Sequence, residues 1–382
     1  MAAAAPVALD YWGALDEPGL TEVVSTALGR PVRLAGFQTT AVAYKPGSPA
    51  TGALLRVAGT TTDGQPWSVF LKVLQHPRHW PRLGQLPAEI RQPFLDNFPW
   101  RGELVAWEPG FADRLPPGMR LPRLYRLADL GDDRLAVWME NVRTLDDPWD
   151  PPRFARAAHA LGRLAGRRSD PALLAASGLP AGTGLRYYSQ SRVELSGLPL
   201  LERDEVWAHP LVAEAGRRPA PGRPARPWRP GCRSSSTAWT PCPRRCPTAT
   251  PVPRTCWSRP TTPTPSWPST CRSRTPRRSG FDLGQLLVGL THAGLLPAAA
   301  LPEVHNVLVP AFTDGLHAEG GRATVDEVTW GYVASLAVRA GFTSLPFERL
   351  SELPTPALAA TFGERAALTR VIADLALALP PA

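Results

Sequence analysis

The chain of 382 residues lacks the features that mark a membrane or secreted protein. No stretch approaches the roughly 20 consecutive apolar residues that a membrane-spanning helix needs. The first ten residues contain no Lys or Arg and only a short apolar stretch, which is unlike a signal peptide. We therefore expect a cytoplasmic protein with no membrane partner. Its length and its 43% hydrophobic residues suffice for one large or two medium-sized domains.

The most unusual absences lie within residues 217–279. These 63 residues contain no Asp, Glu, Lys, Asn, Gln, His, Leu, Ile, Met, Phe or Tyr, and 47 of them are Arg, Pro, Thr or Ser. They hold 14 of the chain's 42 Lys and Arg residues and none of its 33 acids. The formal net charge of +9 therefore divides into +14 for this segment and −5 for the remainder. The basic character, which for a whole chain suggests an anionic partner such as nucleic acid, belongs to one segment.

Metal-ligand patterns are also lacking. All five cysteines of the chain lie in the same segment: Cys232, Cys242, Cys246, Cys256 and Cys271. They form no C-x-x-C pair and no histidine lies near them, so a zinc site is not expected. Three histidines on expected helices have no ligand-like spacing and are interpreted as structural: His159, His292 and His305.

Outside this segment the periodicity of apolar residues changes near residue 142. The first part predicts helices at 16–29 and 88–107, the latter broken near Pro99, and strands at 32–44, 54–59, 67–74, 121–130 and 135–142. The second part predicts helices at 152–168, 281–294, 301–318, 324–340 and 357–379. We expect an α+β fold of two lobes, an antiparallel sheet with helix at 1–142 and a mainly helical lobe at 143–382.

Four local patterns follow one another in a familiar order. They are V-F-L-K-V at 69–73, R-G-E-L-V-A-W at 101–107, A-V-W-M-E-N-V at 136–142 and G-F-D-L-G-Q-L-L at 280–287. Together they resemble the aminoglycoside phosphotransferase and choline kinase-like family of small-molecule kinases, over about residues 20–215 and 280–380. The resemblance implies a two-lobed protein-kinase-like fold in which residues 1–142 form the ATP-binding lobe.

The resemblance also implies roles for individual residues. Lys72 would grip the α and β phosphates of ATP, and Glu103 would be its ion-pair partner on a helix. Asp282 would brace the catalytic loop. The hinge, whose backbone would meet the adenine, includes Met139, Glu140 and Val142. No glycine-rich phosphate loop is recognisable in the N-terminal part.

Each of these residues has a structural alternative. Lys72 alone would be an exposed strand residue, and Glu103 a solvated acid with Glu108 as a competing partner one turn on. Glu140 is a strand-end acid of which only the backbone concerns ATP. Asp282 would in any case be favoured in the first turn of its helix by the helix dipole.

The catalytic residues that the resemblance implies are missing. The family writes them as His-Gly-Asp, four residues, Asn, and then a later Ile-Asp, all shortly before the position of Gly280. No Asp, Asn or His occurs between Arg217 and Ser279. ATP and Mg²⁺ are thus implied as cofactors, but no catalytic residue and no Mg²⁺ ligand can be named in this chain.

Residues 217–279 allow three explanations. A basic linker inserted into a kinase would leave the catalytic motif elsewhere, and a cysteine metal site lacks the spacing. The third explanation is translation out of frame. When the third base of each codon is joined to the first two of the next, residues 247–250 can encode His-Gly-Asp, and Arg254-Thr255 can encode Asn at the family spacing. Residues 265–270 can likewise encode Phe-Val-Ala-Ile-Asp, in which Trp267-Pro268 forces the Ala.

We therefore interpret residues 217–279 as out of frame and expect them to be disordered or misfolded. The function expected of the chain is an ATP-dependent phosphotransferase acting on a small hydroxylated molecule, inactive as written. The alternative is a non-catalytic kinase-like binding protein whose basic arm, with 14 Arg and four Trp, contacts nucleic acid or an acidic partner. The acceptor is not specified, because the polar side chains of the later helices suit many alcohols: Asp314, Glu319, Trp330 and Tyr332.

Overall fold

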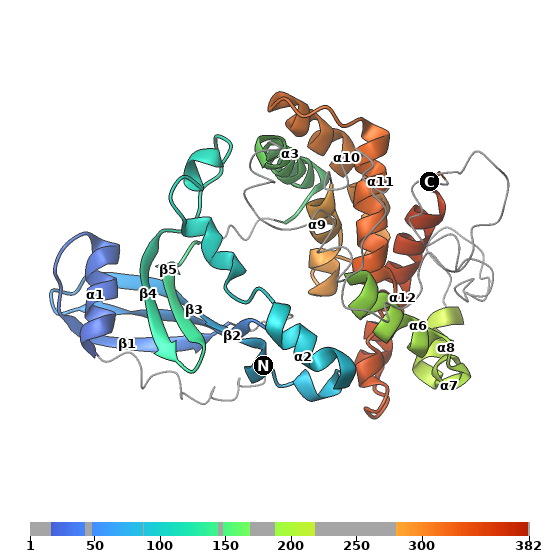
Figure 1. The fold of residues 1–382 in the computed structure, drawn as a ribbon, viewed down its shortest axis with the longest axis horizontal. Helices are drawn as coiled ribbons and strands as arrows, with labels where there is room; N and C mark the ends of the chain where they lie inside the picture. The colour runs from blue at the N-terminus through green and yellow to red at the C-terminus, as the bar shows by residue number, and fades with distance from the viewer. Residues whose placement is uncertain are drawn as a thin grey trace. The chain divides into compact units, whose positions relative to one another are not determined.

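The computed structural model describes residues 17–42, 48–86, 88–143, 148–168, 188–217 and 280–380. Its contacts divide the chain into two units, Met1–Asp147 and Pro148–Ala382. The first contains a five-stranded antiparallel sheet and the second is mainly helical, which confirms the expected α+β composition (Figure 1). The division falls five residues beyond the boundary expected at residue 142.

The sheet of the N-terminal unit has the strand order β1-β2-β3-β5-β4. Its strands are β1 (Leu34–Ala41), β2 (Thr51–Thr61), β3 (Pro66–Gln75), β4 (Leu124–Gly131) and β5 (Arg134–Glu140). The turn between β4 and β5 consists of Asp132 and Asp133, with φ angles of 50° and 53°. Two successive positive φ angles are what a tight two-residue hairpin requires, because that turn follows the right-handed twist of the strands.

The helices of the N-terminal unit lie in two places. Helix α1 (Glu17–Leu28) buries Leu20, Val23 and Val24 against one sheet face, in a cluster with Val57 and Val69. Helix α2 (Ala88–Asn97) is followed by a six-residue 3₁₀ helix, Gly102–Trp107. The break expected near Pro99 is confirmed, since α2 ends at Asn97, in keeping with the bias of the residue before a proline away from the helical conformation. Beyond the break, residues 102–107 form a 3₁₀ helix and not the expected α-helix.

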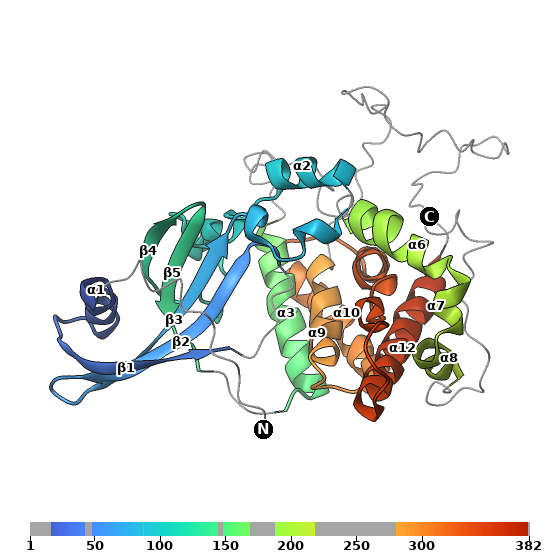
Figure 2. The same cartoon turned by 90° about the horizontal axis from the view of Figure 1, so that it is seen from below.

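The second unit is built from helices. They are α3 (Pro151–Arg168), α6 (Leu198–Leu201), α7 (Asp204–Ala208), α8 (Pro210–Arg217), α9 (Phe281–His292), α10 (Leu301–Ala318), α11 (Val325–Leu336) and α12 (Pro356–Leu377). There are also two π-helical segments. Ser189–Gly197 continues into α6, and Ala337–Gly341 follows α11. Helices α3, α9 and α10 lie side by side in Figures 1 and 2 and share one hydrophobic core. Of the segment 217–279, which we expect to be out of frame, residues 218–279 lie outside the described residues.

Helices α3 and α10 approach each other closely through glycine. A Cβ added to Gly162 would collide with the carbonyl of Phe312, and one added to Gly315 with the carbonyl of His159. The buried face of α3 is Phe154, Ala158, Gly162 and Gly166. Two leucines of the same helix, Leu161 and Leu164, are only half-buried. Glycine at the crossing allows the two backbones to come together where leucine would hold them apart.

Candidate functional site

Strand β3 places Lys72 in the middle of the sheet. It pairs with β2 on one side and β5 on the other, and Lys72 lies opposite Val137 of β5. Because side chains alternate between sheet faces, Lys72 shares its face with Phe70 and Leu74. That face carries an apolar cluster that includes Met139 of β5. Lys72 is therefore a cation on an apolar face, with its side chain 19% exposed.

Glu103 is the partner of Lys72. The Lys72 Nζ donates to Glu103 Oε1 at 2.7 Å and lies within an ion-pair distance of Oε2 as well. The Glu103 side chain is 47% exposed, so the pair lies at the edge of the apolar face. Glu108, the competitor considered from the sequence, is exposed and forms no such pair with Lys72 among the described residues.

Glu103 is carried by a short 3₁₀ helix rather than by the α-helix expected from the sequence. Within Gly102–Trp107 no residue is fully buried. The segment is held by Leu104 and Trp107, which pack on the apolar cluster of the Lys72 face. The indole Nε1 of Trp107 also donates to the carbonyl of Pro122 at 3.0 Å. These contacts fix the position from which Glu103 reaches Lys72.

The end of β5 carries the expected hinge residues. Met139 is buried, lies opposite Phe70 of β3 and thus shares the sheet face of Lys72. Glu140 is partly buried, and its amide donates to the carbonyl of Arg123 at 2.9 Å. The amide of Val142 turns back to the carbonyl of Glu140 at 3.1 Å, and its side chain is exposed. The strand therefore ends in a tight turn directly after Glu140.

The Glu140 side chain has partners that the sequence did not suggest. The two guanidinium nitrogens of Arg120 donate to its two carboxylate oxygens at 2.5 and 2.8 Å, and the Arg123 amide donates to Oε2 at 3.2 Å. The hydrogen bonds from Arg120, and then that from Arg123, hold the pKa of Glu140 below its usual range. Arg120 lies 20 residues away along the chain in an irregular segment, so no periodic pattern marks the pair.

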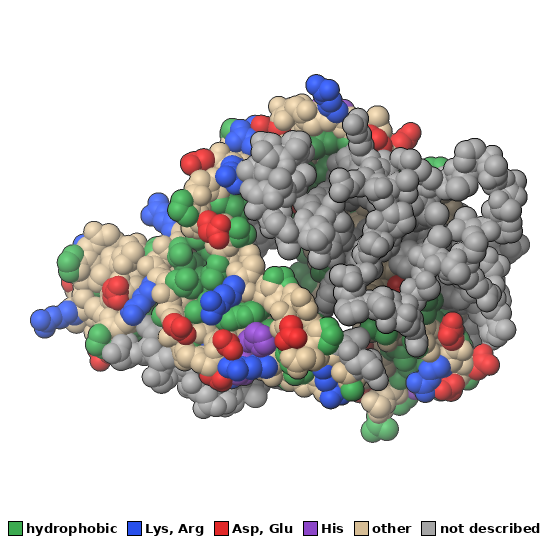
Figure 3. Space-filling view, in the orientation of Figure 1, with side chains coloured by type: hydrophobic (Ala, Val, Ile, Leu, Met, Phe, Trp, Pro, Cys, Tyr) green, Lys and Arg blue, Asp and Glu red, His purple; other side chains and the backbone are tan. Residues whose placement is uncertain are grey.

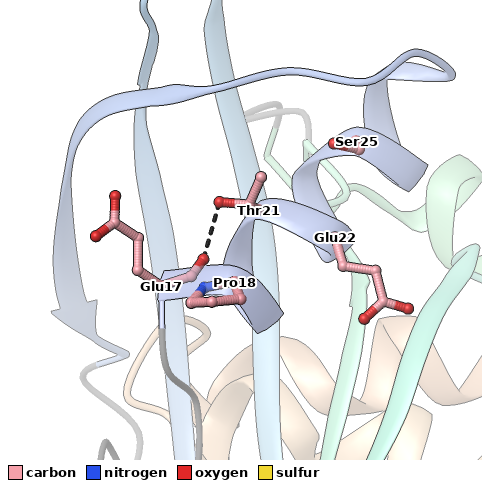
Figure 4. A pocket seen from close by; sticks show the side chains of 5 residues that line it. All are labelled: Glu17, Pro18, Thr21, Glu22 and Ser25. Atoms are coloured by element: carbon pink, nitrogen blue, oxygen red, sulfur yellow. Dashed lines mark hydrogen bonds between the residues drawn. The ribbon is translucent and has the colours of Figure 1, made fainter.

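The described residues of the N-terminal unit line surface hollows, among them the following two. One of about 350 Å³ lies beside Arg120, with Trp107, Leu115 and Met119 in its wall. The other lies along α1 and is lined by Glu17, Pro18, Thr21, Glu22 and Ser25 (Figure 4). In that second hollow Thr21 bonds to its own helix backbone, and Glu22 pairs with Arg126 of β4. Its polar groups do not converge on a common point, so it carries no candidate site.

Charge does not gather by sign on the part of the N-terminal unit that Figure 3 displays. Acidic and basic side chains are interspersed on that face. One local example is the hairpin turn, where Arg78 contacts both Asp132 and Asp133. This face therefore lacks the continuous basic surface that phosphate-backbone binding needs.

Asp282, the remaining candidate, belongs to the helical unit. It lies in the first turn of α9, and its side chain is exposed. The helix begins after Gly280, whose backbone has a φ of 88° and lies against Tyr332. The catalytic loop that Asp282 would brace lies outside the described residues.

The side chains weighed as acceptor contacts lie in different surroundings. Tyr332 is fully buried and its hydroxyl lies 3.2 Å from Nδ1 of His305. Glu319 is paired with both Arg163 and Arg167 of α3, at 2.6 and 2.8 Å. These two residues therefore hold the helices together and do not present an acceptor surface.

Two of the histidines interpreted as structural, His292 and His305, are partly buried in the helical unit. Burial, with the charges of Arg365 and Arg192, lowers the pKa of His292 to about 4. Burial also lowers the pKa of His305, which stacks on the ring of Tyr332. Within the described parts of the chain, no group of three or more His, Cys, Asp or Glu side chains is arranged to hold a metal ion.

Comparison of the chain with protein-family models, with curated proteins and with solved structures found no match. In the described helices, none combines the length and the apolar character needed to cross a membrane.

Proposed function

We propose that this chain is a small-molecule kinase by origin, whose N-terminal unit binds ATP and which, as written, transfers no phosphoryl group. The observation that supports the proposal is the Lys72–Glu103 ion pair on the central strand of the antiparallel sheet. Strand β5 of the same sheet ends at Glu140, and the amide of Val142 turns back to the Glu140 carbonyl. In a protein-kinase-like fold the base of a nucleotide meets such a strand end.

The ion pair suits phosphate binding for an electrostatic reason. A lysine on an apolar sheet face is held in one orientation when a carboxylate lies within hydrogen-bonding distance. The Lys72 ammonium has three N–H donors, and its bonds to the two Glu103 oxygens use two of them, which leaves one for an incoming polyphosphate. In ATP-dependent kinases such a lysine grips the α and β phosphates and is positioned by a glutamate.

The chemistry of transfer needs residues that this chain does not have. A kinase of this type uses an Asp to orient the acceptor hydroxyl, and Asn and Asp side chains to hold Mg²⁺ on the phosphates. No Asp or Asn occurs in residues 217–279, where the family would place them. Without these side chains neither the acceptor oxygen nor the metal is positioned, so bound ATP is held without being used.

Titration of ATP into the full chain by calorimetry tests the binding half of the proposal. We expect Lys72→Met to raise the dissociation constant for ATP by about tenfold or more, because a charge-assisted contact to phosphate is lost. The matched control is Arg33→Met, which removes an exposed cation at the start of β1 and should leave the affinity unchanged. ATP binding that does not respond to Lys72→Met, or that is absent in the unchanged chain, contradicts the proposal.

The alternative, a binding protein with a basic arm, makes a different prediction. Its 14 arginines would give salt-sensitive affinity for nucleic acid that disappears when residues 217–279 are deleted. No contact among the described residues favours this alternative, so we keep it as an outcome of that deletion experiment.

A further inference from the structure

The Glu140 carboxylate is held from two sides at the end of β5. Arg120 meets it with two nitrogens at 2.5 and 2.8 Å, one for each oxygen. The Arg123 amide adds a third hydrogen bond at 3.2 Å. A fork of this kind fixes direction as well as distance, because the guanidinium and the carboxylate must lie in a common plane.

The backbone around Glu140 is tied by further contacts. Its amide pairs with the carbonyl of Arg123 at 2.9 Å, and its carbonyl accepts from the amide of Val142 at 3.1 Å. The side chain of Asn141 donates to Ser68 Oγ at 2.6 Å, which joins the turn to the strand beside it. These contacts of Glu140, Asn141 and Val142 thus fix the position of the main chain that would face a nucleotide base.

We propose that Arg120 is a positioning residue for the nucleoside half of bound ATP: it holds Glu140, and through it the main chain of residues 139–142, in the orientation that meets the base. This inference rests on the proposed ATP-binding function of the N-terminal unit. It assigns Arg120 no contact with ATP itself. The role is separable from that of Lys72, which acts on the phosphates.

If Arg120 only stabilised the fold, its removal would lower the folding stability of the chain. The Arg120 side chain is 62% exposed and that of Glu140 25% exposed. Exposed ion pairs add little to folding stability, because water screens them and both side chains lose freedom. Removal of Arg120 should therefore change the direction of the strand end more than the stability of the chain.

The experiment compares adenosine and ATP as ligands of the full chain, by calorimetry, in four proteins. They are the unchanged chain, Arg120→Gln, Lys72→Met, and the control Arg114→Gln, which changes an exposed arginine of the same connecting segment. We expect Arg120→Gln to raise the dissociation constants for adenosine and for ATP by a similar factor of about five to ten. Lys72→Met should weaken the binding of ATP and leave that of adenosine unchanged. Arg114→Gln should leave the affinity for both ligands unchanged.

Two further variants separate positioning from loss of charge. Arg120→Lys keeps the charge but not the fork, and should recover only part of the adenosine affinity. Glu140→Gln should match Arg120→Gln, and the double variant should be no weaker than either single one, because both act through the same contact.

Each outcome decides the matter. Adenosine affinity that is unchanged in Arg120→Gln overturns the proposal while leaving ATP binding intact. ATP binding without measurable adenosine binding in the unchanged chain also overturns it, since the strand end then contributes nothing to the nucleoside. An unchanged chain that binds neither ligand overturns the proposed function, and the role of Arg120 with it.

Discussion

Lys72 and Glu103, 31 residues apart in the chain, form an ion pair in which Nζ lies 2.7 Å from Oε1. The lysine is fixed by the pairing of three strands, whereas the glutamate sits on a six-residue 3₁₀ helix. The two ends of the pair therefore differ in how firmly they are held. Glu103 is the end whose change is expected to affect ligand binding without disturbing the fold.

Replacement of Glu103 by Gln should weaken ATP binding with little effect on folding. The amide keeps the shape but not the charge, so the orientation of the Lys72 ammonium is less well defined. We expect the dissociation constant for ATP to rise by about three- to tenfold, and the urea midpoint to move little because the pair is partly exposed. Glu108→Gln is the matched control, and an equal effect of both variants would contradict the assignment of Glu103.

Introduction of a methyl group at Gly162 should destabilise the helical unit. The added Cβ would overlap the carbonyl of Phe312, and α3 and α10 would have to move apart. We expect Gly162→Ala to cost about 1–3 kcal/mol in the free energy of unfolding, measured by urea denaturation. The control is Gly289→Ala in α9, where the added methyl meets only the end of the Gln285 side chain. That variant should be neutral or more stable, since alanine favours helix.

The stability of the helical unit should fall with acidity in a window set by His292. Its pKa is about 4 in the folded chain, against a value near 6.5 when unfolded, so the unfolded state binds more protons between these values. Stability is therefore complete above about pH 6.5 and declines as the pH falls toward 4. The decrease in the free energy of unfolding that is due to this histidine is on the order of 3 kcal/mol.

Urea denaturation at pH 7 and at pH 4.5 checks this window. His292→Gln cannot take up the proton, so its stability should change less between the two pH values than that of the unchanged chain. Arg365 and Arg192 are the charged groups that act on this ring, and both remain in the variant. An identical pH response in the two proteins would show that His292 is not the group concerned.

Phosphoryl transfer by the chain as written should be absent. With ATP, Mg²⁺ and a panel of small hydroxylated acceptors, including aminoglycosides, release of ADP should not exceed that of a boiled sample. The reason is the lack of Asp and Asn in residues 217–279. ATP turnover that disappears in Lys72→Met would contradict this prediction.

Much of the fold could be predicted from the sequence because its elements carry strong local patterns. The helix expected over 301–318 has the bounds of α10, and the alternation of apolar residues placed β3 and β5 within a residue or two. These elements are long, and in each of them the apolar residues that are buried recur at one regular spacing along the sequence. The same patterns located Lys72 on a strand, whereas its place between β2 and β5 is known from the structure.

The parts that sequence could not reveal depend on contacts between distant segments. The glycines of α3 form its buried face because α10 approaches them, and an apolar pattern does not count glycine. The residues that carry Glu103 form a 3₁₀ helix and not an α-helix, and Trp107 of that helix is held by the carbonyl of Pro122, 15 residues further along the chain. The Arg120–Glu140 fork joins an irregular segment to a strand end, and the identity of an arginine does not tell which acid it meets.

The nucleotide sequence of the gene across codons 217–279 tests the central claim most directly. If the chain is a kinase whose catalytic segment is out of frame, the shifted frame encodes His-Gly-Asp, four residues and Asn at codons 247–255, and Ile-Asp near codon 270. The gene then also carries one small insertion or deletion near codon 216 and a compensating one near codon 279. A shifted frame without His-Gly-Asp, or one interrupted by stop codons, would contradict the account.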